Sequence, residues 1–255
     1  MRTSVSDPAF WDSLTDHFDA VLHQAACTDT TVTDRAFMWR ENTGTFERLL
    51  AWAEKNGTDV IYASSAATYG NAPSPQTVGR DEHPLNVYGE SKLAMDLLTR
   101  SKLDRTGIKI IGLRYFNVYG PGEAHKNHMA SMIYKLAQQM KEGKRPRIFR
   151  DGTQKRDQVY VDDVVQANLR ALDASKTTSG IYNVGTGAAV SFNDIIAELN
   201  RVLKTNLDPE YIENPYAFFQ HHTEADISST KEKLRYEPRY DLRRGIERYW
   251  RSGAL

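Results

Sequence analysis

The sequence predicts an α/β protein: a doubly wound, mostly parallel sheet followed by a smaller C-terminal lobe. Short apolar runs alternate with longer amphipathic stretches, and this alternation is typical of β-α-β units. The chain has 255 residues, of which 40% are hydrophobic, so it can bury a substantial core as one large domain or a domain with a lobe. It contains neither an internal repeat nor a low-complexity tract.

The elements of the first half follow from apolar runs and capping residues. Asp7, followed by Pro8, predicts a helix that begins about seven residues into the chain. The elements expected next are a strand at 20–22, a helix near 35–55, a strand at 60–64, a helix at about 87–105 and a strand at 108–114.

Acidic and hydroxyl side chains mark helix starts in the second half, because they accept hydrogen bonds from the free N–H groups of a first helical turn. Asp162 and Asp163 predict one such start, and Ser191 predicts the cap of a helix that reaches residue 203. The other elements expected here are a helix near 130–141, a basic loop at 141–150, a strand at 181–184 and a closing helix at about 242–250.

The charge balance and the cysteine count exclude several classes of partner. Lys and Arg together number 33, as do Asp and Glu, so no net positive charge indicates nucleic acid or an anionic membrane. Cys27 is the only cysteine, which excludes intramolecular disulfides and a multi-thiolate metal site. No signal-peptide h-region opens the chain, and no apolar stretch approaches the roughly 18 residues of a membrane helix. We therefore expect a cytoplasmic protein that binds no nucleic acid, membrane or metal.

One feature of a dinucleotide-binding sheet is missing. Such a sheet normally opens with a strand and a Gly-rich turn, yet no G-x-G-x-x-G or close variant occurs in the sequence. On the scale of about 30 residues per β-α-β unit, roughly 50 residues ahead of Met1 would be needed to supply it. We expect either part of a longer enzyme or a degenerate relative, in which the strand at 20–22 forms an exposed edge.

Tyr88 and Lys92 stand four residues apart in the helix expected at 87–105, so they share one helical face. A free tyrosine has a pKa of about 10 and is a poor base at neutral pH, but a neighbouring ammonium group favours the phenolate. The pair indicates a proton-transfer device, although a Y-x-x-x-K pattern on its own usually carries no chemistry.

Ser65 follows the strand at 60–64, at the position where open α/β sheets bind ligands. Its hydroxyl group could hydrogen-bond a substrate oxygen while Tyr88 moves the proton. The alternative is a turn serine that bonds nearby backbone. With Tyr88 and Lys92 at this spacing, we favour the first interpretation.

Several longer stretches resemble a known family. The residues that carry the resemblance are 63–70 (ASSAATYG), 84–89 (PLNVYG), 114–121 (RYFNVYGP), 125–126 (HK) and 155–157 (KRD). From about residue 18 to residue 250 the chain resembles the extended short-chain dehydrogenase/reductases, and within them the epimerases that act at C6 of ADP-glycero-manno-heptose.

This resemblance implies a Rossmann-like sheet and an epimerisation by transient oxidation and re-reduction with bound NADP, or with NAD, for the supply of lipopolysaccharide core heptose. In the family a tyrosine and a lysine on opposite sides of the sugar are the two acid/base groups, and they match Tyr88 and Lys126 here. Lys92 would contact the nicotinamide ribose and lower the pKa of Tyr88, and Ser65 would orient the reacting oxygen. Without the resemblance, Lys126 reads as a surface lysine.

The resemblance also implies the binding residues, an ADP-sugar as substrate and a homo-oligomer. The cofactor-binding set is Gln24, Ala25, Ala26, Cys27, Thr28, Asn42, Lys92, Val118 and Lys126. The substrate-binding set is Ser65, Asn117, His128, Lys135, Phe149, Arg150, Asp151, Gly152, Arg156 and Phe219. Arg156 suits a diphosphate because its planar fork bonds phosphate oxygens in pairs.

Three of these residues depart from the family pattern. His128 stands where a small hydroxyl residue is usual, Lys135 where a histidine is common, and Phe219 where a tyrosine is usual. Such changes bear on substrate preference and not on the catalytic set.

The expected division places residues 1–120 and 156–185 in an NADP-binding region and residues 121–155 and 186–255 in a substrate-binding lobe. The turn at 185–187 (GTG) is expected to be structural, because it follows a late strand. Two alternatives stay open. One is a redox-dead or truncated remnant that binds a nucleotide sugar, and the other is a different nucleotide-sugar 4-epimerase or reductase, which would not require Lys126.

Overall fold

The first half of the fold is a four-stranded parallel sheet in the order β1-β2-β3-β7, in a computed structural model that describes residues 4–213 and 220–255. Its strands are β1 Ala20–His23, β2 Asp59–Ser65, β3 Ile110–Tyr115 and β7 Gly180–Val184. β2 and β3 are buried along most of their length, as parallel strands covered on both faces are. β1 lies at the edge of the sheet, where Leu22 is 42% exposed.

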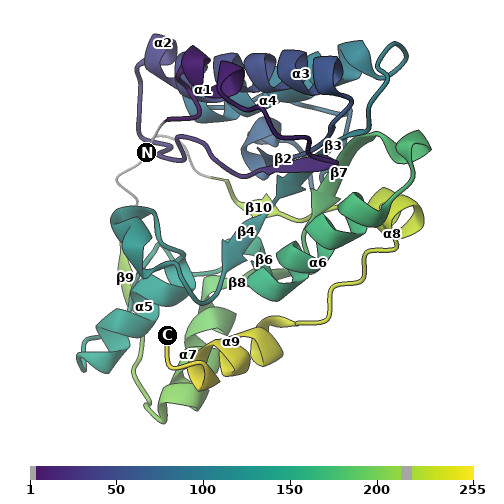
Figure 1. Ribbon diagram of the computed structural model, residues 1–255. Helices are drawn as coiled ribbons and strands as arrows, with labels where there is room; N and C mark the ends of the chain where they lie inside the picture. Colours follow the sequence, from purple (N-terminus) through teal and green to yellow (C-terminus); the bar gives the residue numbers. More distant parts are fainter. Residues whose placement is uncertain (1–3, 214–219) are drawn as a thin grey trace.

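Helices cover both faces of this sheet, which confirms the doubly wound arrangement. One layer holds α1 Pro8–Asp12, α2 Arg35–Met38, α3 Thr45–Asn56 and α4 Val87–Lys102, and the other holds α6 Val161–Asp173 and α8 Ser228–Leu234 (Figure 1). Within the described residues, the helices all lack the combination of length and apolarity that crossing a membrane demands.

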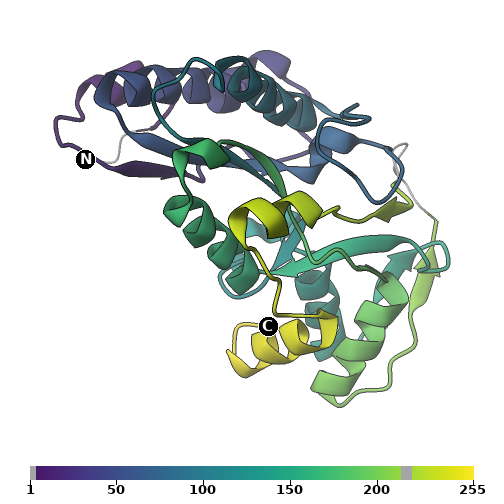
Figure 2. The same cartoon turned by 90° about the vertical axis from the view of Figure 1, so that its right-hand side faces the viewer.

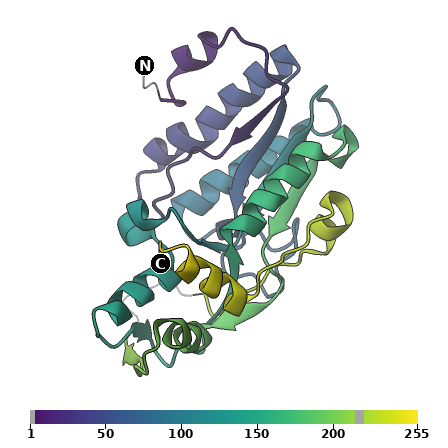
Figure 3. The same ribbon diagram turned by 60° about the horizontal axis from the view of Figure 1, so that its bottom comes forward.

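A second group of strands forms the smaller lobe. β6 Lys155–Tyr160 pairs with β4 Asn117–Tyr119, β10 His222–Thr223 and β8 Ala189–Ser191, and β5 Arg147–Phe149 pairs with β9 Glu210–Ile212. Three helices share an apolar core with these strands: α5 Met132–Lys141, α7 Phe192–Leu203 and α9 Leu242–Arg251. The turned views show these helices gathered away from the layer of α1 to α4 (Figures 2 and 3).

The long elements lie close to their predicted positions, and the differences are local. The helix near 35–55 contains a π-helical segment, Trp39–Gly44, between α2 and α3. The basic loop at 141–150 contains β5. The sequence analysis predicts none of β4, β5, β8, β9 and β10, because strands of two or three residues show no readable period. It also does not predict the longer elements β6 and α8. The predicted cap at Ser191 is confirmed, since its hydroxyl group accepts a hydrogen bond of 3.1 Å from the N–H of Asp194.

Candidate active site

A cavity of about 880 Å³ lies at the carboxyl ends of β2 and β3 and is lined by residues of both the sheet and the smaller lobe. The predicted site residues in its wall are Gln24, Ala26, Thr28, Ser65, Tyr88, Lys92, Asn117, Val118, Lys126, Phe149 and Arg156. All four predicted catalytic residues therefore meet at one cavity, although they come from segments far apart in the sequence.

Tyr88 is placed against Ser65 by a close approach between α4 and the turn that follows β2. Asn86 caps α4, and its side chain accepts a hydrogen bond of 2.8 Å from the N–H of Gly89. A Cβ atom on Gly89 would lie 2.6 Å from the carbonyl oxygen of Ala67, so the approach requires glycine. Burial raises the pKa of Tyr88, and a hydrogen bond with Ser65 opposes that increase.

Lys92 faces the aromatic ring of Tyr88. Its Nζ lies 5.9 Å from the ring centroid and donates a hydrogen bond of 2.8 Å to the carbonyl oxygen of Ala63. Burial lowers the pKa of Lys92 to about 8, and the charge of Asp96 opposes the decrease. The expectation that Lys92 lowers the pKa of Tyr88 stays a prediction. In this structure the pKa of Tyr88 is raised, chiefly because the phenol is buried.

A buried charge network joins α4 to β2 and β3, and the sequence analysis missed it. The Asp96 carboxylate accepts hydrogen bonds from Tyr62 Oη at 2.8 Å, Ser64 Oγ at 2.9 Å and Arg114 Nε at 2.8 Å. Arg114 also forms an ion pair of 2.7 Å with Glu82. Because these buried charges are paired with one another, they fix the position of the helix against the strands. The sequence did carry a signal for this network: Asp96 and Arg114 are each a charged residue within an otherwise apolar stretch.

Asn42 bridges the loop after β1 and helix α4. Its Oδ1 accepts a hydrogen bond of 2.8 Å from the N–H of Cys27, and its Nδ2 donates to the Cys27 carbonyl at 3.1 Å and to Ser91 Oγ at 3.0 Å. Asn42 is 1% exposed. Of the predicted cofactor set, Ala25, Cys27 and Asn42 stand outside the cavity wall and shape it from behind.

Lys126 lies on a 3₁₀ turn, Ala124–Met129, and is exposed. The ends of this loop are held by Glu123, whose carboxylate accepts hydrogen bonds from the N–H of Gly120 at 3.2 Å and of Ser131 at 2.6 Å. Lys126 belongs to the cavity wall, and within the described part of the chain its ammonium group forms no ion pair.

His128 and Lys135 stand outside the cavity wall. His128 Nε2 lies 3.4 Å from Asp29 Oδ2, and Lys135 Nζ donates a hydrogen bond of 3.2 Å to the His128 carbonyl. The two residues therefore connect the turn that carries Lys126 to the loop after β1 and to α5.

Arg150, Asp151 and Gly152 form the turn between β5 and β6 and also stand outside the cavity wall. The Asp151 side chain accepts a hydrogen bond of 3.1 Å from the N–H of Thr153, and Gly152 has a φ of 73°, which favours glycine. These residues shape the turn that precedes Arg156. Phe219 lies outside the described residues.

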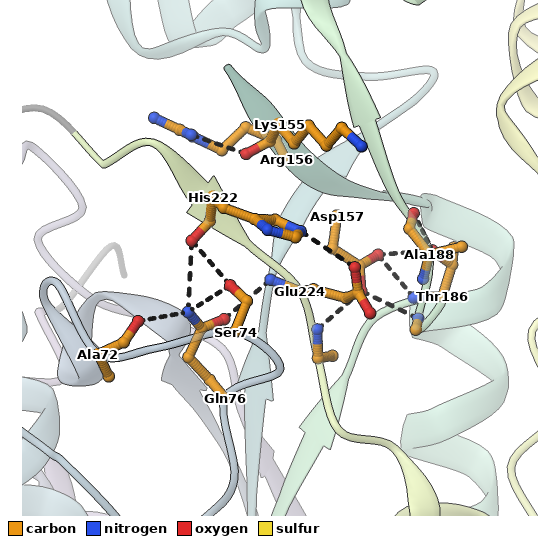
Figure 4. A network of polar contacts seen from close by, with 12 residues as sticks. Ala72, Ser74, Gln76, Lys155, Arg156, Asp157, Thr186, Ala188, His222 and Glu224 are labelled. Atoms are coloured by element: carbon orange, nitrogen blue, oxygen red, sulfur yellow. Dashed lines mark hydrogen bonds and ion pairs between the residues drawn. The ribbon is translucent and has the colours of Figure 1, made fainter. Parts of the chain in front are cut away.

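Arg156 and Asp157 leave β6 on opposite sides (Figure 4). The Asp157 carboxylate accepts hydrogen bonds from the N–H groups of Thr186 at 2.7 Å, Gly187 at 2.9 Å and Ala225 at 3.0 Å. The Asp157 carboxylate thus accepts the hydrogen bonds that a phosphate would need from the turn at 185–187. This confirms the structural role predicted for that turn. Arg156 faces the cavity, and burial lowers its pKa to about 10.

The cavity wall also holds residues that the sequence analysis missed. They include Asn86, Tyr115, Arg147, Gln154 and Gln158. The spacing of two residues between Gln154, Arg156 and Gln158 was the signal that could have revealed two of them.

Comparison with known proteins gives a consistent result. Residues 1–185 match the model of the NAD dependent epimerase/dehydratase family. The chain is 37% identical over 253 residues to an ADP-L-glycero-D-manno-heptose-6-epimerase of Cupriavidus pinatubonensis, an alignment that covers 90% of this chain and 76% of that protein.

Two solved structures are similar in fold. The ADP-L-glycero-D-manno-heptose-6-epimerase of Helicobacter pylori has a TM-score of 0.93 and 42% identity, with 100% of this chain and 79% of that chain covered. The UDP-glucuronic acid 4-epimerase of Bacillus cereus, in complex with UDP-glucuronic acid and NAD, has a TM-score of 0.81 and 28% identity, with 98% and 77% covered. Since the family model matches well over half of its residues, the chain belongs to the NAD-dependent epimerase/dehydratase family.

Proposed function

We propose that this protein inverts C6 of ADP-glycero-manno-heptose by transient oxidation and re-reduction with bound NADP, and so supplies heptose for the lipopolysaccharide core. The observation that carries the proposal is the single cavity that Ser65, Tyr88, Lys92 and Lys126 line together. The similarity to two ADP-L-glycero-D-manno-heptose-6-epimerases supports the choice of substrate. A cytoplasmic location and a homo-oligomeric state are part of the proposal.

The residues on the β1 side of the cavity fit a nicotinamide dinucleotide. Ala26 is small enough for close approach to a ligand, and Val118 offers an apolar surface to a flat ring. Gln24 is held in place by Tyr115, whose hydroxyl group donates a hydrogen bond of 3.0 Å to its Oε1. Lys92, at the end of the same wall, would hold the ribose. When bound, the nicotinamide would supply the redox chemistry, a reversible hydride transfer with the sugar carbon.

Tyr88 and Lys126 take the two proton-transfer roles. The reacting hydroxyl group points to opposite sides in the two epimers, so an acid/base group is needed on each side. Tyr88 comes from α4 and Lys126 from the turn after β4, which are separate parts of the cavity wall. Ser65 bonds Tyr88 and orients the sugar oxygen between them.

The substrate lies along the β5 and β6 side of the cavity in this proposal. Arg156 binds the diphosphate, and its partial burial strengthens such a contact. Asn117 and Phe149 contact the rest of the ADP-sugar from the same wall. The remaining members of the proposed set, from the adjoining turns, are His128, Lys135, Arg150, Asp151 and Gly152.

The test is direct. The purified chain, supplied with NADP, is incubated with ADP-D-glycero-D-manno-heptose, and the C6 epimer is followed by proton NMR. We expect conversion by the wild-type chain and none by a Tyr88→Phe variant. Binding without conversion would favour the redox-dead alternative. Conversion of UDP-glucose to UDP-galactose instead would favour a 4-epimerase.

A further inference from the structure

Two glutamines flank Arg156 on the wall of the cavity. Gln154 and Gln158 are each 5% exposed, and both line the cavity together with Arg156. Residues two apart in an extended chain share one face. Asp157, between them, faces the other way and bonds the turn after β7, as Figure 4 shows. Gln154, Arg156 and Gln158 therefore form one polar row, which we call the β6 row.

The amide groups of the two glutamines have no protein partner in residues 4–213 and 220–255. Neither side chain makes a hydrogen bond to another residue there, in contrast to Gln24 and Gln76. A side-chain amide carries two N–H donors and an acceptor oxygen. Neither amide is among the fully buried polar atoms that lack a partner, so the two groups open onto the cavity that both residues line. Two amides that are free of protein partners and line the same cavity are therefore suited to a polar ligand.

The β6 row has a direction. Gln158 is the register partner of Asn117 on β4, and β6 continues into α6. Asn168 on α6 accepts a hydrogen bond of 3.1 Å from Gln24, on the side of the cavity assigned to the cofactor. Gln158 is thus the member nearest the reacting groups.

Gln154 is the member at the opposite end of the row. It follows the turn that leads from β5, the strand that brings Arg147 and Phe149 to the cavity wall. At about 3.3 Å per residue of extended chain, each glutamine lies roughly 7 Å from Arg156, Gln158 within β6 and Gln154 just before it. A ligand whose diphosphate sits at Arg156 therefore meets one amide on each side of it.

We propose that the amide of Gln158 hydrogen-bonds hydroxyl groups of the sugar and that the amide of Gln154 hydrogen-bonds the nucleoside. This assignment rests on the proposed function in taking the ligand to be an ADP-sugar. It makes Gln158 a specificity residue for the sugar, because a site that offers buried donors and acceptors discriminates against a ligand that leaves them unpaired.

The experiment compares two ligands that differ in the sugar. Calorimetry measures the dissociation constants for ADP and for ADP-glycero-manno-heptose. The full 255-residue chain is used, and the variants are Gln158→Leu, Gln154→Leu and Gln138→Leu. The last is the matched control, since Gln138 is half-buried on α5 outside the cavity. We expect Gln158→Leu to weaken the ADP-sugar about tenfold while ADP binding stays within about twofold. Gln154→Leu should weaken both ligands by the same factor, and Gln138→Leu neither.

Two results would overturn the inference. In the first, Gln158→Leu weakens the binding of ADP and of the ADP-sugar by the same factor. In the second, Gln158→Leu leaves the affinity for both ligands unchanged. A Gln158→Glu variant, which keeps the length of the side chain but not its donors, guards against a packing defect in the leucine variant. If the wild-type chain prefers a UDP-sugar, the proposed function fails. The same variants, measured with UDP and that UDP-sugar, still decide whether Gln158 contacts the sugar.

Discussion

Glu123 accepts two hydrogen bonds from Ser131, one from its N–H at 2.6 Å and one from its hydroxyl group at 3.0 Å. The same carboxylate accepts a third from the N–H of Gly120 at 3.2 Å. Glu123 is 5% exposed, and a carboxylate tolerates such burial where hydrogen bonds replace its hydration. The loop that carries Lys126 is therefore anchored at both ends by one buried side chain.

Glu123→Gln should lower kcat for C6 epimerisation about tenfold with little change in KM. An amide nitrogen would then face a donor that the carboxylate now bonds, so the loop shifts and Lys126 loses its position. Steady-state kinetics with the proposed substrate measure the effect. The matched control is Glu142→Gln, an exposed position at the end of α5, which should leave both constants unchanged. An unchanged kcat in Glu123→Gln would contradict the anchoring role.

Lys126→Met should lower kcat by about a hundredfold or more, since it removes one of the two acid/base groups. ADP affinity should stay the same, because the change leaves Arg156 in place. Lys144→Met, an exposed position outside the principal cavity, serves as control. Full activity of Lys126→Met toward a UDP-sugar would point to 4-epimerisation instead.

Gly89→Ala should damage both stability and catalysis. The new Cβ would lie 2.6 Å from the carbonyl oxygen of Ala67, so α4 must move away from the turn after β2. We expect a loss of about 1–3 kcal/mol in the free energy of unfolding, together with a lower kcat as Tyr88 leaves Ser65. Urea denaturation and steady-state kinetics measure the two effects. Gly107→Ala, where a Cβ meets nothing within 4 Å, should change neither.

The sequence predicts most of the sheet and its helices, because long elements carry readable periods and caps. It also predicts that Ser65, Tyr88 and Lys92 meet at one cavity, because they lie in local motifs whose spacing reflects one strand end and one helix face. Lys126 is different. Its role came from the resemblance, since an exposed lysine on a turn carries no local signal.

The residues that hold the catalytic set could not be predicted in the same way. Asp96 meets Tyr62 and Arg114 only after α4 packs on the sheet, and Glu123 meets Ser131 only after the loop closes. The burial that raises the pKa of Tyr88 has the same origin. Spacing placed Lys92 on the correct helix face, but the position of the Ala63 carbonyl and the burial of the phenol are properties of the packed structure.

His23 should make the protein less stable in mild acid. It ends β1, is 5% exposed, and stacks on Phe46 with 6.3 Å between the ring centroids. Burial, and then the charge of Lys92, lowers its pKa from 6.5 to about 4. Between these values the unfolded chain binds a proton that the folded protein does not. The contribution of His23 to stability is therefore complete above about pH 6.5 and is lost as the pH falls toward 4.

Between pH 7 and pH 4, the loss of the His23 contribution lowers the free energy of unfolding by about 3 kcal/mol. Urea unfolding at several pH values in that range, in the wild type and in His23→Leu, measures it. On acidification the wild type should lose more stability than His23→Leu, by up to this amount. The carboxylates that also titrate in this range are common to both proteins, so their effect cancels in the comparison. His17→Leu is the control, since the His17 side chain is 74% exposed, and its curve should run parallel to that of the wild type. Parallel curves for the wild type and His23→Leu would instead mean that the His23 imidazole gains its proton in the folded protein as readily as in the unfolded chain.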